Sequence, residues 1–305
     1  MRAYVGVTDN DWYGYLAARP DLREVNFWRP RDAREFKVIG PGDPFVFKTR
    51  SPWNQLVGGG VFEAFVTLTI SSAWDFFGEG NGVSSHDELV VRLCAITGES
   101  PSQIGDREIG CVLLRDVSFF PEDSLLPAPV SFSRNIVQGK SFGYPGEDVV
   151  VDSAVELILG GAGFAVREVE NLGPTRGTPR LVVPRLGQGG FKAVVQQIYG
   201  RRCAVTEHKI VPTLQAAHIV PVSMGGEHRA DNGLLLRSDV HTMFDRGYLG
   251  IDPEYRLRVS PRLKAEFSNG DELYSREGEL ISLPRLNRDR PSPEFLAWHM
   301  DAVFR

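Results

Sequence analysis

The hydrophobic pattern of the first half of the chain alternates between the two-residue period of strands and the spacing of helices. The expected strands lie at 2–7, 44–48, 55–69 and 109–114. The expected helices lie at 9–18, capped by Asp9 or Asn10, and at 87–96. Several strands with few helices between them are typical of a mixed, mostly antiparallel sheet. We therefore expect an α+β domain over residues 1–168.

A change of pattern follows this domain. Glycine and proline recur throughout 170–190 and interrupt every period, so we expect a linker at 169–190. The stretch 191–201 then has apolar residues on one helical face, and 291–304 contains a last helix capped at Ser292. Residues 191–305 are long enough to bury a core of their own, which predicts a second domain.

Within the second domain, 215–247 predicts a strand, a turn, a second strand and a helix. The first strand carries His218, and the turn contains Gly225 and Gly226. The second strand runs to Leu236, and Ser238 or Asp239 is expected to cap a helix that begins near Val240. Histidine and aspartate then stand four residues apart on that helix, at His241 and Asp245, so they share a face.

These residue types suit metal-assisted hydrolysis of a phosphodiester. A neutral imidazole can take a proton from water, while a divalent ion polarises the phosphate. His218 is the candidate base, and His241 and Asp245 are candidate ligands. The alternative for a single histidine on an apolar strand is a place in the core. His228 is expected to be exposed in the polar turn, and the spacing identifies no partner for His208.

The order and spacing of these residues resemble the HNH (ββα-metal) endonuclease family. The resemblance implies that His218 is the general base, that Asn232 holds it in orientation, and that His241 binds a metal ion, with Asp245 as a further ligand. Mg²⁺ is the expected ion and Mn²⁺ an alternative, with double-stranded DNA as the substrate. The family often has a metal-binding Asp or His before the base, where this chain has Ala217. The ion would then keep more of its waters, which suits Mg²⁺.

The first domain contains GDPFVFK and VGGGVFEAF, which weakly resemble the PUA-like superfamily, including its EVE and ASCH members. That resemblance implies a small curved barrel whose pocket holds a flipped base. The whole arrangement resembles restriction endonucleases that place a recognition domain before an HNH nuclease, which implies a role in defence against foreign DNA. Modified cytosine is one candidate for the recognised base. The side chains expected to stack on such a base or read its edge are Trp12, Tyr13, Asn26, Trp28 and Trp74. The alternative is that these aromatic residues belong to the core.

Charge and composition add to this prediction. The net charge is −5, but residues 191–250 have seven basic and five acidic side chains, about +2. The candidate DNA-binding residues there are Arg201, Arg202, Arg237 and Arg246. Three distant cysteines argue against a zinc knuckle. No apolar segment indicates a signal peptide or membrane span, so a cytoplasmic protein is expected. A homodimer would supply two active sites for a duplex cut. A non-catalytic DNA-binding protein with a decayed metal site and an RNA-acting protein remain alternatives.

Overall fold

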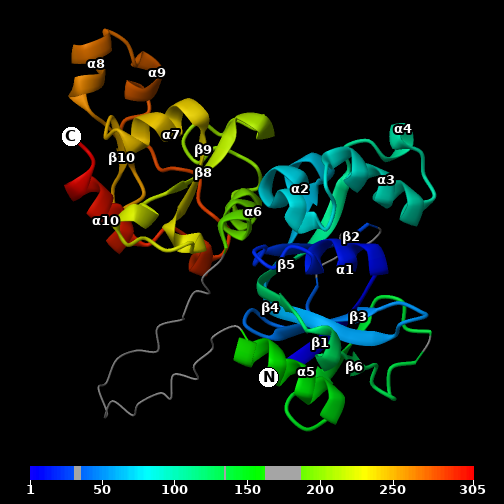
Figure 1. Cartoon of the computed structure of the whole chain (residues 1–305). Helices are drawn as coiled ribbons and strands as arrows, with labels where there is room; N and C mark the ends of the chain where they lie inside the picture. Colours follow the sequence, from blue (N-terminus) through cyan, green and yellow to red (C-terminus); the bar gives the residue numbers. More distant parts are fainter. Residues whose placement is uncertain (31–35, 134, 162–186) are drawn as a thin grey trace, which may run out of the picture. The chain divides into compact units, whose positions relative to one another are not determined.

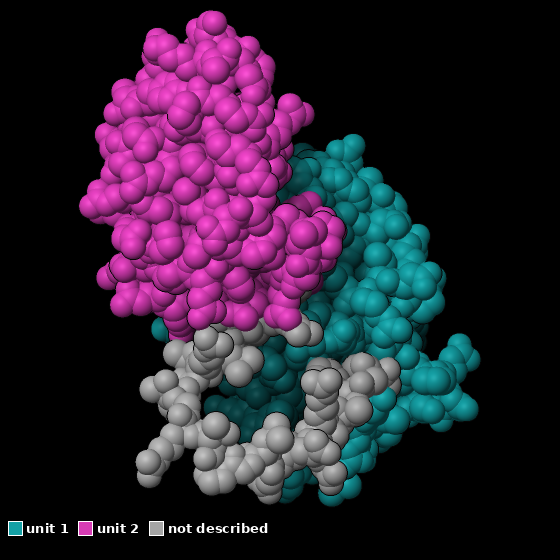
Figure 2. Space-filling model, turned by 90° about the vertical axis from the view of Figure 1, so that its left-hand side faces the viewer, with its two compact units in different colours: residues 1–184 teal, residues 185–305 magenta. Residues whose placement is uncertain are grey.

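The computed structural model describes residues 1–30, 36–133, 135–161 and 187–305. The chain divides into two compact units, which are residues 1–184 (unit 1) and residues 185–305 (unit 2) (Figure 2). Most of the predicted linker lies outside the described residues. Its last residues belong to the helix α6 (Gln188–Ile198), which therefore begins earlier than the sequence predicted. Across the described part of the chain, no helix is both long enough and apolar enough to cross a membrane.

Unit 1 is built on a seven-stranded sheet in the order β2-β5-β4-β3-β1-β7, with β6 paired to β4. The strands β1 and β3 are parallel, and the other pairs are antiparallel. The strands are β1 (Arg2–Thr8), β2 (Val25–Arg29), β3 (Pro44–Thr49), β4 (Gln55–Thr69), β5 (Glu108–Phe119), β6 (Leu126–Pro127) and β7 (Gly139–Gly143). The α+β class is confirmed. The closed barrel is not confirmed, because the path from β2 to β7 stays open among the described residues.

Five α-helices of the described part of unit 1 accompany this sheet. They are α1 (Asn10–Ala17), α2 (Ile70–Phe77), α3 (His86–Thr97), α4 (Pro101–Ile104) and α5 (Val149–Gly161). The first begins where the sequence predicted, because the Asp9 side chain accepts a hydrogen bond from the backbone of Trp12. The third likewise begins after Ser85, whose side chain accepts from the backbone of Glu88.

The two faces of the sheet are covered by different helices. Alternate residues of β3 point to opposite faces. Phe45 and Phe47 pack with Phe27, and Phe47 also packs with Trp12 of α1. Val46 belongs to a separate cluster of buried residues that includes much of α5. In Figure 1, α1 and α5 accordingly lie on opposite sides of β1 and β3.

One glycine of the run in β4 allows α5 to lie close to the sheet. A Cβ on Gly59 would lie 2.3 Å from Cδ1 of Ile158 and 2.4 Å from the carbonyl oxygen of Phe45. A larger residue would push the helix away, since buried side chains are already packed at close to crystal density. Gly59 is therefore needed for this packing.

Unit 2 contains the predicted strand, turn, strand and helix. The strands β8 (Leu214–His218) and β9 (Gly233–Arg237) pair antiparallel, and α7 (Ser238–Asp245) follows directly. The expected cap at Ser238 or Asp239 is wrong. The helix already begins at Ser238, and its N-cap Arg237 makes no capping bond through its side chain.

The remaining elements of unit 2 surround this hairpin and close its core. They are α6, the paired strands β10 (Leu249–Ile251) and β11 (Leu257–Val259), and the helices α8 (Pro261–Phe267), α9 (Asp271–Tyr274) and α10 (Pro293–Ala302). The leucines of β9 are buried among residues of α6, α7, β10 and α10. The hairpin and α7 are therefore held by helices from both ends of the unit.

Candidate active site

The pairing of β8 with β9 places the candidate base at the end of its strand. His218 pairs with Gly233, and the preceding Ala217 is completely buried in the core. A Cβ on Gly233 would lie 2.5 Å from Val195 of α6, so glycine lets that helix approach closely. Phe191 of α6 consequently stacks on the ring of His218, with ring centroids 4.0 Å apart and planes inclined by 12°.

Asn232 fixes the backbone on both sides of the loop that follows His218. Its Oδ1 accepts a hydrogen bond from the backbone N–H of Val220 at 2.9 Å. Its Nδ2 donates to the carbonyl oxygens of Val220 and Glu227, both at 3.0 Å. The side chain is completely buried, so water does not compete for these bonds. These bonds hold the loop, and the predicted role of Asn232 in orienting His218 stays a prediction.

His218 is half-buried, and this lowers its proton affinity. Desolvation, with smaller contributions from His228 and His241, lowers the pKa of His218 to about 4. The ring therefore remains neutral at neutral pH, with a lone pair available to accept a proton. An anionic phosphate brought beside it would favour the protonated form and raise that pKa.

The helix α7 brings the second histidine and the aspartate together. Nε2 of His241 lies 3.3 Å from Oδ2 of Asp245, and Nδ1 of His241 lies 2.8 Å from Oε1 of Gln215 on β8. An amide oxygen only accepts, so Nδ1 of His241 donates to Gln215 when that nitrogen carries the proton of the ring. In the neutral ring, the Nε2 lone pair then faces a carboxylate, an arrangement that a cation or a proton between them would stabilise. The pKa of Asp245 is raised, because the effect of partial burial is larger than the opposing effect of His241.

These residues fit a divalent ion that keeps much of its water. Two donor atoms 3.3 Å apart can both reach one ion, because adjacent ligands of an octahedral Mg²⁺ at about 2.1 Å are separated by roughly 3 Å. Among the described residues, no group of three or more His, Cys, Asp or Glu side chains is arranged to hold a metal. His241 and Asp245 would thus bind the ion with water and phosphate as the remaining ligands.

One hollow of unit 2 is lined by His218, His241 and Asp245 together. It also includes His228, which sequence reasoning placed in an exposed turn. That expectation is wrong, because His228 is half-buried and its Nδ1 lies 3.0 Å from Nε2 of His218. The histidine-rich composition of 208–241 was the available signal, but the contact depends on how the loop turns back.

The four candidate DNA-binding arginines do not line this hollow. Arg237 and Arg246 line a different one, where Arg237 forms an ion pair with Asp239 at 2.7 Å. Arg202 is exposed, and Arg201 is partly exposed with a positive φ of 57°. Their contact with DNA remains a prediction.

The expected base-recognition residues of unit 1 are only partly brought together. Trp12 and Trp28 line a common hollow, whereas the other three do not. Tyr13 packs against Trp53 and Phe119. Asn26 and Trp28 lie on strand β2. Asn26 is completely buried and donates a hydrogen bond to Asn81, so it cannot read a base without rearrangement.

The family comparison identifies the segment that forms this site. Residues 203–252 match the model of a family described as HNH endonuclease. Unit 2 contains an HNH endonuclease domain. The matched segment includes His218, Asn232, His241 and Asp245, whereas α6 and α10 lie outside it. The predicted kinship with HNH nucleases is confirmed. No curated protein matches the chain.

Two solved structures are similar to larger parts of the chain. A structure of ASCH from Zymomonas mobilis has 13% sequence identity and a TM-score of 0.34, and the match covers 51% of this chain and 94% of that one. A structure described as modification dependent TagI restriction endonuclease has 13% identity and a TM-score of 0.28, covering 92% of this chain and 75% of that one. Similarities of this size establish neither a shared fold nor a shared activity.

Proposed function

We propose that the HNH endonuclease domain hydrolyses phosphodiester bonds of double-stranded DNA with a divalent metal ion, most simply Mg²⁺. The observation that carries this proposal is the single hollow lined by His218, His241 and Asp245. A base and a pair of metal ligands facing one space are what attack of water on phosphorus requires.

Each residue has a separate task in this proposal. His218, neutral and stacked on Phe191, takes a proton from the attacking water. Asn232 keeps the end of the strand and its loop in place through its three hydrogen bonds. Gln215 holds the proton on Nδ1 of His241, which leaves Nε2 free for the ion. When bound, the ion supplies the positive charge that polarises the phosphate and stabilises the departing 3′ oxygen.

The test of this proposal separates catalysis from binding. His218→Ala is expected to abolish cleavage of duplex DNA in Mg²⁺ and Mn²⁺ while leaving its affinity for DNA within about two-fold, since phosphate contacts dominate affinity. His208→Ala is the matched control, because His208 does not line the hollow. Metal-dependent cleavage by purified His218→Ala would refute the assignment. Tight DNA binding by the wild type without cleavage in either ion would favour the decayed-site alternative.

We also propose that unit 1 selects the DNA, as in a restriction enzyme, by taking one unstacked base into its own hollow. The walls include Trp12, Phe27 and Trp28. Trp12 and Trp28 are almost completely buried, so partly exposed Phe27 is the one of these three rings that is open to a stacking base. Polar groups at the rim could read the edge of a base or contact a phosphate. These are Asp9, Arg29, Arg50 and Gln138.

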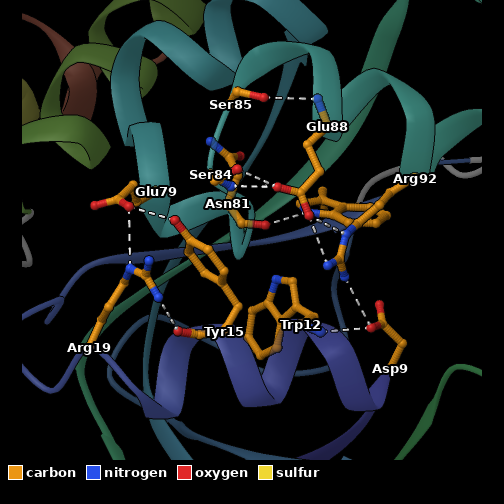
Figure 3. Close-up of polar contacts among 11 residues, drawn as sticks. Asp9, Trp12, Tyr15, Arg19, Glu79, Asn81, Ser84, Ser85, Glu88 and Arg92 are labelled. Atoms are coloured by element: carbon orange, nitrogen blue, oxygen red, sulfur yellow. Dashed lines mark hydrogen bonds and ion pairs between the residues drawn. The ribbon is translucent and has the colours of Figure 1, made fainter.

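The position of Asp9 in this hollow is fixed by its neighbours. Its Oδ1 accepts from the backbone N–H of Trp12 at 2.7 Å and lies 3.4 Å from Arg92, which also binds Glu88 (Figure 3). Also lining the hollow, Arg29 donates to the side-chain oxygen of Gln138 at 2.8 Å. A carboxylate held in this way can accept a hydrogen bond from the amino group of a base at little further entropic cost.

Modified cytosine is the base to test first. Matched duplexes with cytosine, 5-methylcytosine or 5-hydroxymethylcytosine would be offered to the wild type, with His218→Ala as the blank. Cleavage of modified DNA alone would support a modification-dependent defence nuclease, and equal cleavage of all three would remove the selective role of unit 1. Preferential cleavage of structured RNA would instead show that RNA is the substrate. Light scattering with bound duplex would test the homodimer that a double-strand cut favours.

The hollow itself can be tested by binding. In the His218→Ala background, Arg50→Ala is expected to weaken binding of the preferred duplex by about ten-fold, as loss of a charged contact to DNA would. Arg19→Ala is the matched control, because Arg19 pairs with Glu79 outside the hollow. Equal affinities for the two variants would exclude this hollow as the reading site.

A further inference from the structure

The ring of His228 is joined to that of the candidate base by a direct hydrogen bond. Nε2 of His218 and Nδ1 of His228 are 3.0 Å apart, and the ring centroids are 5.0 Å apart. At this distance one nitrogen must carry a proton and the other a lone pair, since two lone pairs would repel. The hydrogen bond therefore couples the tautomer of His218 to that of His228.

The loop between these histidines is built for this contact. Asn232 binds the carbonyl oxygen of Glu227, the residue next to His228, and both backbone groups of Val220, two residues after His218. A Cβ on Gly226 would lie 1.8 Å from the carbonyl oxygen of Val220, so only glycine allows the loop to return so closely. The folded loop thus brings the two histidines within hydrogen-bonding distance of each other.

The aromatic ring of Phe191 limits the movement of the pair. It lies parallel to His218 and 5.7 Å from His228, centroid to centroid.

His241 on α7 is the other titratable group that acts on His218. In the loop itself, Arg229 and Asp231 neutralise each other in an ion pair at 2.6 Å, and Glu227 precedes His228.

We propose that His228 is a positioning residue that selects the tautomer of the general base. Nε2–H of His218 donates to Nδ1 of His228, which leaves Nδ1 of His218 as the atom that accepts the proton of the attacking water. After that transfer His218 is an imidazolium, and its Nε2–H still donates to His228, so the charge is stabilised where it forms. The catalytic consequence rests on the proposed nuclease function, whereas the tautomer does not.

The tautomer can be measured on the whole chain without any cleavage. Long-range ¹H–¹⁵N correlation of the histidine-labelled protein at neutral pH is expected to show His218 protonated at Nε2 and bare at Nδ1. His228→Ala should remove this preference and mix the two tautomers. A wild-type His218 protonated at Nδ1 would overturn the proposal even if the protein cleaves DNA.

Two substitutions of His228 test, by steady-state kinetics, whether the tautomer of His218 matters for catalysis. His228→Ala is expected to lower kcat about 10- to 100-fold with KM little changed, as loss of a supporting hydrogen bond commonly does. His228→Asn places an acceptor oxygen close to the position of Nδ1 and should restore most of that loss. His208→Ala should match the wild type.

Three outcomes would overturn the positioning role. The first is a wild-type kcat in His228→Ala, and the second is a His228→Asn variant as slow as His228→Ala. The third is a ten-fold or larger rise, in His228→Ala, of the Mg²⁺ concentration needed for half-maximal rate. The last would make His228 a metal ligand. If the wild type cleaves no nucleic acid at all, the proposed function fails, and the tautomer measurement still decides the role of His228.

Discussion

Replacement of Asn232 by alanine would remove a side chain that bonds to the backbone at two points of the active-site loop. The change deletes an acceptor for the N–H of Val220 and two donors to the carbonyl oxygens of Val220 and Glu227, at 2.9 to 3.0 Å. Asn232 is completely buried, so water cannot take its place without opening the structure. The N–H and the carbonyl oxygen of Val220, which is itself buried, would lose these partners, whereas the carbonyl oxygen of Glu227 also accepts from the N–H of Arg229 and keeps that bond.

The size of the effect follows from these three bonds. A hydrogen bond contributes about 1 kcal/mol net, and a buried group left without a partner costs about 1 to 3 kcal/mol. We therefore expect Asn232→Ala to destabilise the closed loop by about 3 kcal/mol, or roughly 100-fold in the equilibrium between closed and open loops. This is a large part of the total stability of a typical domain, about 5 to 15 kcal/mol.

Hydrogen exchange of the full chain is the suitable assay, because two units need not unfold in a single transition. The amide of Val220 should exchange about 100-fold faster in Asn232→Ala, while amides of the unit 1 sheet should be unchanged. Asn287→Ala, at an exposed position, is the matched control and should leave both unchanged. An unchanged rate at Val220 in Asn232→Ala would refute the reasoning.

Three further predictions concern the same unit. Gly226→Ala should reduce cleavage at least about ten-fold with DNA binding kept, since its Cβ would meet the carbonyl oxygen of Val220 at 1.8 Å; a wild-type rate would show that the loop adapts. Asp245→Asn should raise the Mg²⁺ concentration for half-maximal cleavage about ten-fold, and an unchanged metal titration would exclude Asp245 as a ligand. Burial lowers the pKa of His299 to about 4, so between pH 6.5 and 4 the unfolded chain binds more protons and stability falls as pH falls. In urea unfolding, the loss of stability between pH 6.5 and 4 should be smaller in His299→Gln than in the wild type. The same pH dependence of stability in the wild type and in His299→Gln would contradict this prediction.

The sequence predicted which elements carry the candidate site residues better than it predicted their packing. His218, Asn232, His241 and Asp245 could be placed because the pattern of strand, turn, strand and helix is local. The contacts of His228 and Gln215 could not be found in this way. They depend on how the loop returns and on which face of β8 meets α7, and both are set by tertiary packing.

In unit 1 the sequence located the elements more reliably than the pocket. Asn26 and Trp28 were candidates to read or stack on an extruded base. In the structure, β2 is an edge strand paired with β5, and Val25, Asn26 and Trp28 on it are buried. These side chains are buried by elements that are distant in the sequence. The local pattern of apolar and polar residues therefore does not predict that they are buried. Asn81, which accepts hydrogen bonds from Asn26 and Trp28, is such a distant partner.

The position of α6 and α10 has a practical consequence for protein engineering. The segment that matches HNH endonucleases is 203–252, yet Phe191 stacks on His218, and Gln188, His299 and Val303 line the hollow. A fusion that joined only the matched segment to a different DNA reader would leave the base without its stacking partner and the hollow without part of its wall. A transplantable cutting module would have to start before α6 and continue through α10.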